Sequence, residues 1–172
     1  MRTSLVISFI GDDRPGLVEK ISAAVSNHAG NWLESRMSQL AGKFAGIVRV
    51  GVATEHIEGM TKALQALDSE GLSVLVEASE VALRSDPHQI LQLNMIGLDR
   101  PGIVREVSQA LAKYGINVLE MTTDITNAPM TGELMFNAEA SIEIPENVDI
   151  KDLHDQLEAI TDDLAVEMDL VI

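Results

Sequence analysis

The chain has 172 residues, a net charge of −15 and no cysteine. With 27 acidic against 12 basic side chains, it lacks the clustered Lys and Arg that bind a nucleic-acid backbone or an anionic membrane surface. The absence of cysteine excludes disulfides, thiolate metal sites and cysteine nucleophiles. The first apolar run ends at Gly11, too soon for a secretory leader, so we expect a cytoplasmic protein.

The second half of the sequence repeats the first half at an offset of 86 residues. Residues 11–18, Gly-Asp-Asp-Arg-Pro-Gly-Leu-Val, align with residues 97–104, Gly-Leu-Asp-Arg-Pro-Gly-Ile-Val. Between positions 11 and 34, 11 of 24 residues are identical to their partners without a gap. Pro87 stands near the join and blocks the continuation of a regular element. The sequence therefore predicts two domains, residues 1–86 and residues 87–172.

The first half alternates between strand and helix patterns. Residues 5–10 form a mostly apolar run that ends in a turn, which is typical of a buried strand. Apolar residues then recur at helical spacing after Pro15, and a turn at 41–43 separates two strand-like segments. In chain order, the predicted elements are a strand at 5–10, a helix at 17–25, strands at 31–40 and 47–52, a helix at 57–70 and a strand at 72–83.

The second half repeats this order. Asp149 and Asp152 stand at the start of its last helix, where carboxylates can accept hydrogen bonds from free amides. The predicted elements are a strand that contains Leu91, a helix at 103–114, strands at 116–126 and 133–144, a helix at 149–161 and a strand at 164–172. The order predicts an α+β protein of two tandem ferredoxin-like βαββαβ units, each an antiparallel sheet with its helices on one face.

Both halves place Asp-Arg-Pro-Gly, at residues 13–16 and 99–102, where the first strand leads into the first helix. Proline fixes the backbone before the helix, and glycine leaves room for a close approach to the backbone. The free amides of a helix start can bind a carboxylate or a phosphate. The simpler interpretation is a stiff turn in which the Asp caps the helix and Arg14 or Arg100 lies in solvent.

This pattern resembles the ACT domain. The resemblance rests on Asp-Arg-Pro-Gly after an apolar strand, a helix, and then Asn31 or Asn117 at the next strand, and it covers nearly all of the chain. ACT domains are small regulatory modules that bind amino acids, usually at interfaces between two copies. Two tandem units without a catalytic domain are similar to the glycine cleavage system transcriptional repressor family.

The resemblance implies a ligand site built from the strand–helix loop and the asparagine. Loop amides would bind the ligand carboxylate, and the asparagine offers both a donor and an acceptor. Amino-acid-binding relatives often carry Asn where this chain has Asp13 and Asp99, and a carboxylate there repels a carboxylate but attracts an ammonium group. The implied site residues are Gly11, Asp13, Arg14, Pro15, Gly16 and Asn31 in the first half, and Gly97, Asp99, Arg100, Pro101, Gly102 and Asn117 in the second.

Other chemistry is not indicated. No pair of histidines has a metal-ligand spacing such as His-x-x-x-His, and the chain has neither a Gly-x-Ser-x-Gly motif nor a Walker glycine loop. We therefore expect no catalytic residues, no metal and no cofactor. The resemblance adds only an amino-acid effector, glycine or a similar one.

The negative charge is concentrated in the second half. Residues 1–86 hold 8 basic and 11 acidic residues, for a net charge of −3, while residues 87–172 hold 4 and 16, for a net charge of −12. Asp152 and Asp155 are expected to lie away from the apolar stripe of Leu153, Leu157 and Ile160. Such residues form either an ordinary solvated helix face or a patch for a basic protein partner.

The resemblance and the charge together predict a non-catalytic, amino-acid-responsive regulator. It would repress glycine cleavage genes through contact with a DNA-binding activator, without binding nucleic acid or membrane itself. The alternative is a free regulatory subunit of an amino-acid-metabolism enzyme, which would share every local feature. A third interpretation is a small enzyme with an unfamiliar site. The lack of a paired nucleophile and base argues against it. Whether the chain forms a homo-oligomer stays open.

Overall fold

The computed structural model describes residues 2–79, 89–146, 148–164 and 166–171. The chain divides into two compact units, Met1–Leu83 and Arg84–Ile172, here called the first and second unit. The predicted boundary between residues 86 and 87 lies outside the described residues. Among the helices that are described, none is long and apolar enough to cross a membrane.

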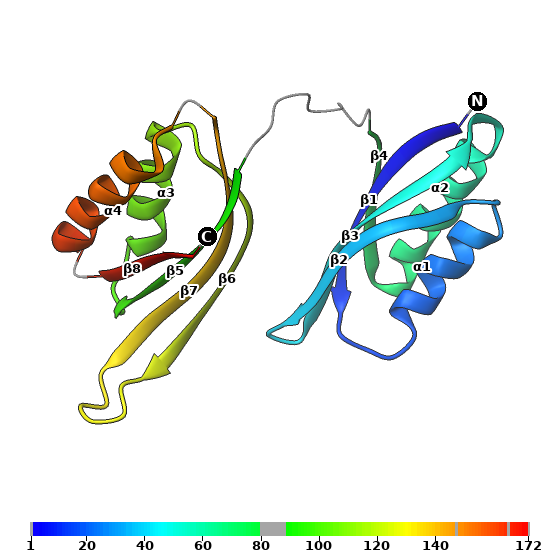
Figure 1. The fold of residues 1–172 in the computed structure, drawn as a ribbon. Helices are drawn as coiled ribbons and strands as arrows, with labels where there is room; N and C mark the ends of the chain where they lie inside the picture. The colour runs from blue at the N-terminus through cyan, green and yellow to red at the C-terminus, as the bar shows by residue number, and fades with distance from the viewer. Residues whose placement is uncertain (1, 80–88, 147, 165, 172) are drawn as a thin grey trace. The chain divides into compact units, whose positions relative to one another are not determined.

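The first unit has the predicted βαββαβ order (Figure 1). A tight turn at Ala41 and Gly42 separates β2 from β3 and makes the predicted hairpin, while the second helix ends early and continues as a short 3₁₀ segment. The elements are β1 (Arg2–Asp12), α1 (Leu17–Ser26), β2 (Asn31–Leu40), β3 (Lys43–Ala53), η1 (Thr54–His56), α2 (Ile57–Gln65), η2 (Ala66–Glu70) and β4 (Leu72–Ala78).

The second unit repeats the fold. Asp149 begins its last helix as predicted, because its carboxylate accepts a hydrogen bond of 2.8 Å from the Lys151 amide. The elements are β5 (Gln89–Leu98), α3 (Ile103–Lys113), β6 (Asn117–Asn127), β7 (Leu134–Ile144), α4 (Ile150–Leu164) and β8 (Val166–Val171).

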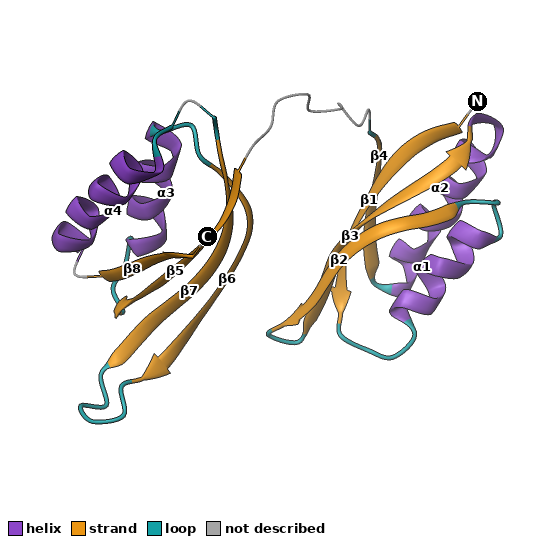
Figure 2. Cartoon of the chain, in the orientation of Figure 1, coloured by secondary structure: helices purple, strands orange, loops and turns teal. Residues whose placement is uncertain are grey.

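Each unit is an antiparallel sheet with two helices on one face (Figure 2). The strand order is β2-β3-β1-β4 in the first unit and β6-β7-β5-β8 in the second. Strand side chains alternate between the two faces, so Leu5, Ile7 and Phe9 of β1 are buried under the helices. The other face of each sheet carries no helix of its own unit. The predicted ferredoxin-like fold is confirmed.

Each unit also has its own hydrophobic core. In the first, Ile21 of α1 and Leu64 of α2 pack with Val50 of β3, and all three are fully buried. In the second, Leu153 and Leu157 of α4 are buried as the apolar stripe predicts. The side chain of Ile160 is outside the described residues. Because the two clusters share no residue, each unit buries its apolar surface by itself.

Candidate ligand-binding loops

The two Asp-Arg-Pro-Gly loops connect the first strand and first helix of each unit, as predicted. Each begins with a main-chain anchor to the neighbouring hairpin: the Asp13 amide donates to Gly42 O at 2.9 Å, and the Asp99 amide to Leu134 O at 2.8 Å. The residues that follow, through Gly16 and Gly102, lie at the surface, where a ligand can reach them.

Glycine begins both helices in a left-handed conformation. Gly16 has φ +93° and Gly102 has φ +97°, and neither helix start has a side-chain capping hydrogen bond. The expectation that Asp13 or Asp99 caps the helix is therefore wrong. The capping positions belong to Gly16 and Gly102, three residues after the aspartates, and their αL backbone is one that an L side chain adopts only at a cost.

Replacing Gly16 with Ala should lower the free energy of unfolding by about 1–2 kcal/mol, the usual penalty for an L-residue in this conformation. Gly16→Asn should lose less, because Asn tolerates the left-handed region. Steric clash does not contribute to this loss, since nothing lies within 4 Å of a Cβ built at Gly16. Denaturation followed by the fluorescence of Trp32, the single tryptophan of the chain, measures both losses. Equal losses for Ala and Asn would contradict the conformational explanation.

Gly11 is buried at the end of β1, and its lack of a side chain allows the turn before β4 to pack on it. A Cβ at Gly11 would lie 2.8 Å from Gly71 O and 3.0 Å from Leu72 Cδ1. This contact fixes Glu70, at the end of η2, beside the loop. Neither the motif nor the repeat indicates Glu70, which is far from the loop along the chain.

The two loop arginines have different partners. Arg100 forms a two-point pair with Glu106, with Nη1–Oε1 at 3.1 Å and Nη2–Oε2 at 2.7 Å. Arg14 instead donates to the carbonyl oxygen of Glu70, whose carboxylate pairs with Lys20. Lys20 occupies the position that Glu106 has in the second unit. The exchange of Lys20 for Glu106 therefore changes which partner the arginine has.

These pairs shift acid–base equilibria in the expected directions. Hydrogen bonding to Arg100 holds the pKa of Glu106 below its ordinary value and raises the pKa of Arg100. The pKa of Glu70 is lowered by its hydrogen bond to Lys20 and further by the charges of Lys20 and Arg14. The Glu70 and Glu106 side chains are thus ionised at neutral pH.

A Glu106→Gln variant should show a stability difference from wild type that depends on pH. Because the folded-state pKa of Glu106 is lowered from 4.5, the ion pair contributes fully above that pH, and its contribution is lost as the pH falls through the lowered pKa. The gap in the free energy of unfolding between the two proteins should therefore close on acidification. Chemical denaturation at a series of pH values, followed by Tyr114 fluorescence, measures it. A gap that stays constant would contradict the ion pair.

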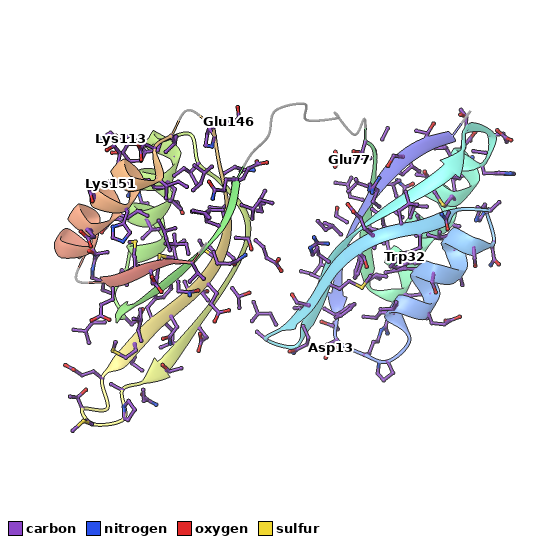
Figure 3. The ribbon with its side chains drawn as sticks, in the orientation of Figure 1. Asp13, Trp32, Glu77, Lys113, Glu146 and Lys151 are labelled. Carbon is purple, nitrogen blue, oxygen red and sulfur yellow. The ribbon has the colours of Figure 1, made fainter. Side chains whose placement is uncertain are left out.

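The structure does not bring the loop and the asparagine together within a unit. The sheet registers place Asn31 level with Gly51 of β3, and Gly51 level with Ser4 near the start of β1. The loop begins after Asp12, which lies about 26 Å further along β1 at roughly 3.3 Å per residue. In Figure 3 the labelled Asp13 lies apart from Trp32, the neighbour of Asn31.

The second unit has the same arrangement. Asn117 lies level with Glu143 and Ile90, at the opposite end of the sheet from Leu98 and the loop, and its Nδ2 donates to Glu143 Oε2 at 3.4 Å. One amino acid cannot span that length. A ligand held by both a loop and an asparagine would need the asparagine of a different ACT unit.

A cluster of exposed side chains on α4 is not indicated by the sequence motifs. His154, Asp155 and Glu158 place potential ligand atoms within 4.8 Å of one another, and His154 Nδ1 lies 3.7 Å from Glu158 Oε1. Histidine spacing does not indicate this group, because its sequence pattern is a His and a Glu four residues apart on a helix. All three side chains are exposed, as is Asp152, so Asp152 and Asp155 lie away from the buried apolar stripe, as predicted.

Much of the remaining acidity lies on the helix-free face of the second sheet. Asn94 of β5 pairs with Glu139 on one side and Asp169 on the other, and the next row holds Asp124 and Glu167. All four carboxylate residues are exposed. The strands β5 to β8 contain no Lys or Arg, whereas the first sheet has Arg36 and Arg49. The acidic surface thus includes a sheet face that the helix periodicity did not predict.

The comparisons with known proteins assign both units to one family. ACT-domain profiles match residues 3–79 and residues 91–163. No curated protein matches the sequence. A crystal structure of a protein of unknown function from Galdieria sulphuraria has 28% identity and a TM-score of 0.87, with 100% of each chain covered.

A second solved structure is provisionally named as a glycine cleavage system transcriptional repressor. It has 16% identity and a TM-score of 0.75, with 99% of this chain and 97% of that chain covered. At that identity, the likeness establishes the shared fold of two tandem units. The profile matches and the fold together show that the chain belongs to the ACT-domain family, with two regulatory ACT domains in tandem.

Proposed function

We propose that the chain is a non-catalytic regulator that responds to an amino acid, glycine or a similar one, and represses glycine cleavage genes. The observation that carries this proposal is the alignment of both ACT units with the protein provisionally named as a glycine cleavage system transcriptional repressor. The exposed loops support an amino-acid effector, because a helix start offers backbone amides to a carboxylate and, in the first unit, Arg14 offers a guanidinium as well.

The regulator acts through a protein partner rather than on DNA. The second unit, with its net charge of −12, presents carboxylates on α4 and on the helix-free sheet face. Such a surface repels phosphates and attracts a basic protein, and opposite potentials accelerate the encounter. The partner is then a DNA-binding activator of the glycine cleavage genes. The effector alters this contact through a different affinity for the free and bound states.

Two experiments on the full chain test the partner. In a gel-shift assay at physiological salt, the purified protein alone should leave a glycine cleavage promoter fragment unshifted, and a direct shift would overturn the proposed mechanism. Affinity purification from the source cells should return a DNA-binding transcription factor. Recovery of an amino-acid-metabolism enzyme in its place would favour the alternative, a free regulatory subunit.

A further inference from the structure

We propose that only the loop of the first unit binds the effector carboxylate. In the second unit, the carboxylate of Glu106 is already hydrogen-bonded to Arg100, the equivalent of Arg14. This inference rests on the proposed function, since it assumes an amino-acid effector. It assigns the two copies different roles: the first is the sensor, and the second is held closed by its own side chain.

The second unit shows what its loop binds when a carboxylate is present. The Glu106 carboxylate accepts two hydrogen bonds from the Arg100 guanidinium, the geometry with which arginine binds a free carboxylate. It also lies against the loop, since a Cβ built at Gly102 would be 3.3 Å from Glu106 Oε1. Glu106 is in the first turn of α3, where the helix dipole favours a negative charge. An internal carboxylate therefore takes the place of a ligand.

The first unit leaves this place open. Lys20 replaces Glu106, so a second cation stands where the other copy has an anion. Arg14 donates one hydrogen bond, to the Glu70 carbonyl, and a guanidinium has five N–H donors. The Glu70 carboxylate pairs with Lys20. Among the described residues, Arg14 is thus hydrogen-bonded to a carbonyl oxygen and to no carboxylate, and its guanidinium keeps donors for an incoming carboxylate.

The other charged groups near the loop do not explain the difference. Asp13 and Asp99 occupy equivalent positions, and the following Arg-Pro-Gly is identical in the two copies. Asp12 at the end of β1 pairs with Lys43, which holds its pKa low. Two neighbouring positions also change charge, since Arg105 replaces Glu19 and Leu98 replaces Asp12, but of these side chains it is Glu106 that is hydrogen-bonded to a loop arginine. The residue at position 20 or 106 therefore decides whether that arginine has a carboxylate partner.

Reciprocal charge variants of the full chain test this assignment. Wild type, Lys20→Glu and Glu106→Lys are titrated calorimetrically with the common amino acids, glycine first. We expect wild type to bind one molecule per chain. Lys20→Glu should reproduce the closed loop and weaken binding at least tenfold, whereas Glu106→Lys should open the second loop and raise the stoichiometry to two. Lys20→Met, which removes the cation without adding a carboxylate, should weaken binding less than Lys20→Glu.

The possible results separate this inference from the proposed function. Two molecules bound per wild-type chain, unchanged binding by Lys20→Glu, or one molecule bound by Glu106→Lys would each overturn the inference and leave an amino-acid regulator standing. Wild type that binds no amino acid would overturn both. Circular dichroism of each variant shows whether a loss of binding comes from a loss of fold. If Lys20→Glu does not fold, the binding affinity of Lys20→Met tests whether the Lys20 cation contributes to the site in the first loop.

Discussion

Leu64→Ala should lower the free energy of unfolding of the first unit by about 2–5 kcal/mol, the range for truncating a buried leucine. Leu64 is fully buried in α2, between the sheet and α1, so the change leaves a cavity in the middle of the core. Because the two cores share no residue, the second unit should keep its stability.

The chain supplies its own probes for this experiment. Trp32, its only tryptophan, packs against the first core, and Tyr114, its only tyrosine, packs against the second. Leu64→Ala should move the denaturation midpoint seen by Trp32 and leave that seen by Tyr114 in place. Leu153→Ala, in the buried stripe of α4, is the matched control and should do the reverse. If both probes move together in both variants, the two units do not unfold independently.

Gly11→Ala should destabilise the first unit by about 1–3 kcal/mol, the usual range for forcing extra atoms into a packed site. The added Cβ would lie 2.8 Å from the Gly71 carbonyl oxygen, a main-chain atom that cannot rotate away. The turn that ends at Gly71 must move, and it carries Glu70, the partner of Arg14 and Lys20. The variant should therefore also weaken effector binding.

Gly51→Ala provides the comparison within the same sheet. A Cβ at Gly51 would meet its nearest atom, Leu33 Cδ1, at an ordinary 3.5 Å. Alanine also lowers the entropy cost of ordering the strand, so this variant should be neutral or slightly stabilising. Thermal unfolding of the two variants, followed by Trp32 fluorescence, makes the comparison. A Gly11→Ala protein as stable as Gly51→Ala would show that the close contact with Gly71 is not limiting.

The fold was largely predictable because its determinants are local and occur twice. The mostly apolar run at residues 5–10, the helical spacing in α1 and the turn at residues 41–43 each indicate one element, and the repeat supports the βαββαβ order. The helix at 57–70 was predicted as one element, whereas the structure ends α2 at Gln65 and continues with the 3₁₀ segment η2. The strand predicted at 72–83 ends earlier, since β4 stops at Ala78, and residues 80–83 lie outside the described residues.

The candidate site was less predictable, because its contacts join distant parts of the chain. The motif gave the loops, but Glu70 meets Arg14 only through the packing of a turn on Gly11. The exchange of Lys20 for Glu106 is visible in the alignment, yet only the structure shows that position 106 reaches the arginine. Likewise, sheet register rather than sequence places Asn31 at the far end of its unit from the loop.

The most direct test of an amino-acid-responsive regulator is calorimetric titration of the full wild-type chain with each common amino acid. We predict saturable binding of at least one, with Arg14→Ala weakening it about tenfold or more, as the loss of a charge-assisted hydrogen bond does. An absence of saturable binding with every amino acid, from a protein shown to be folded by the Trp32 and Tyr114 signals, would contradict this function.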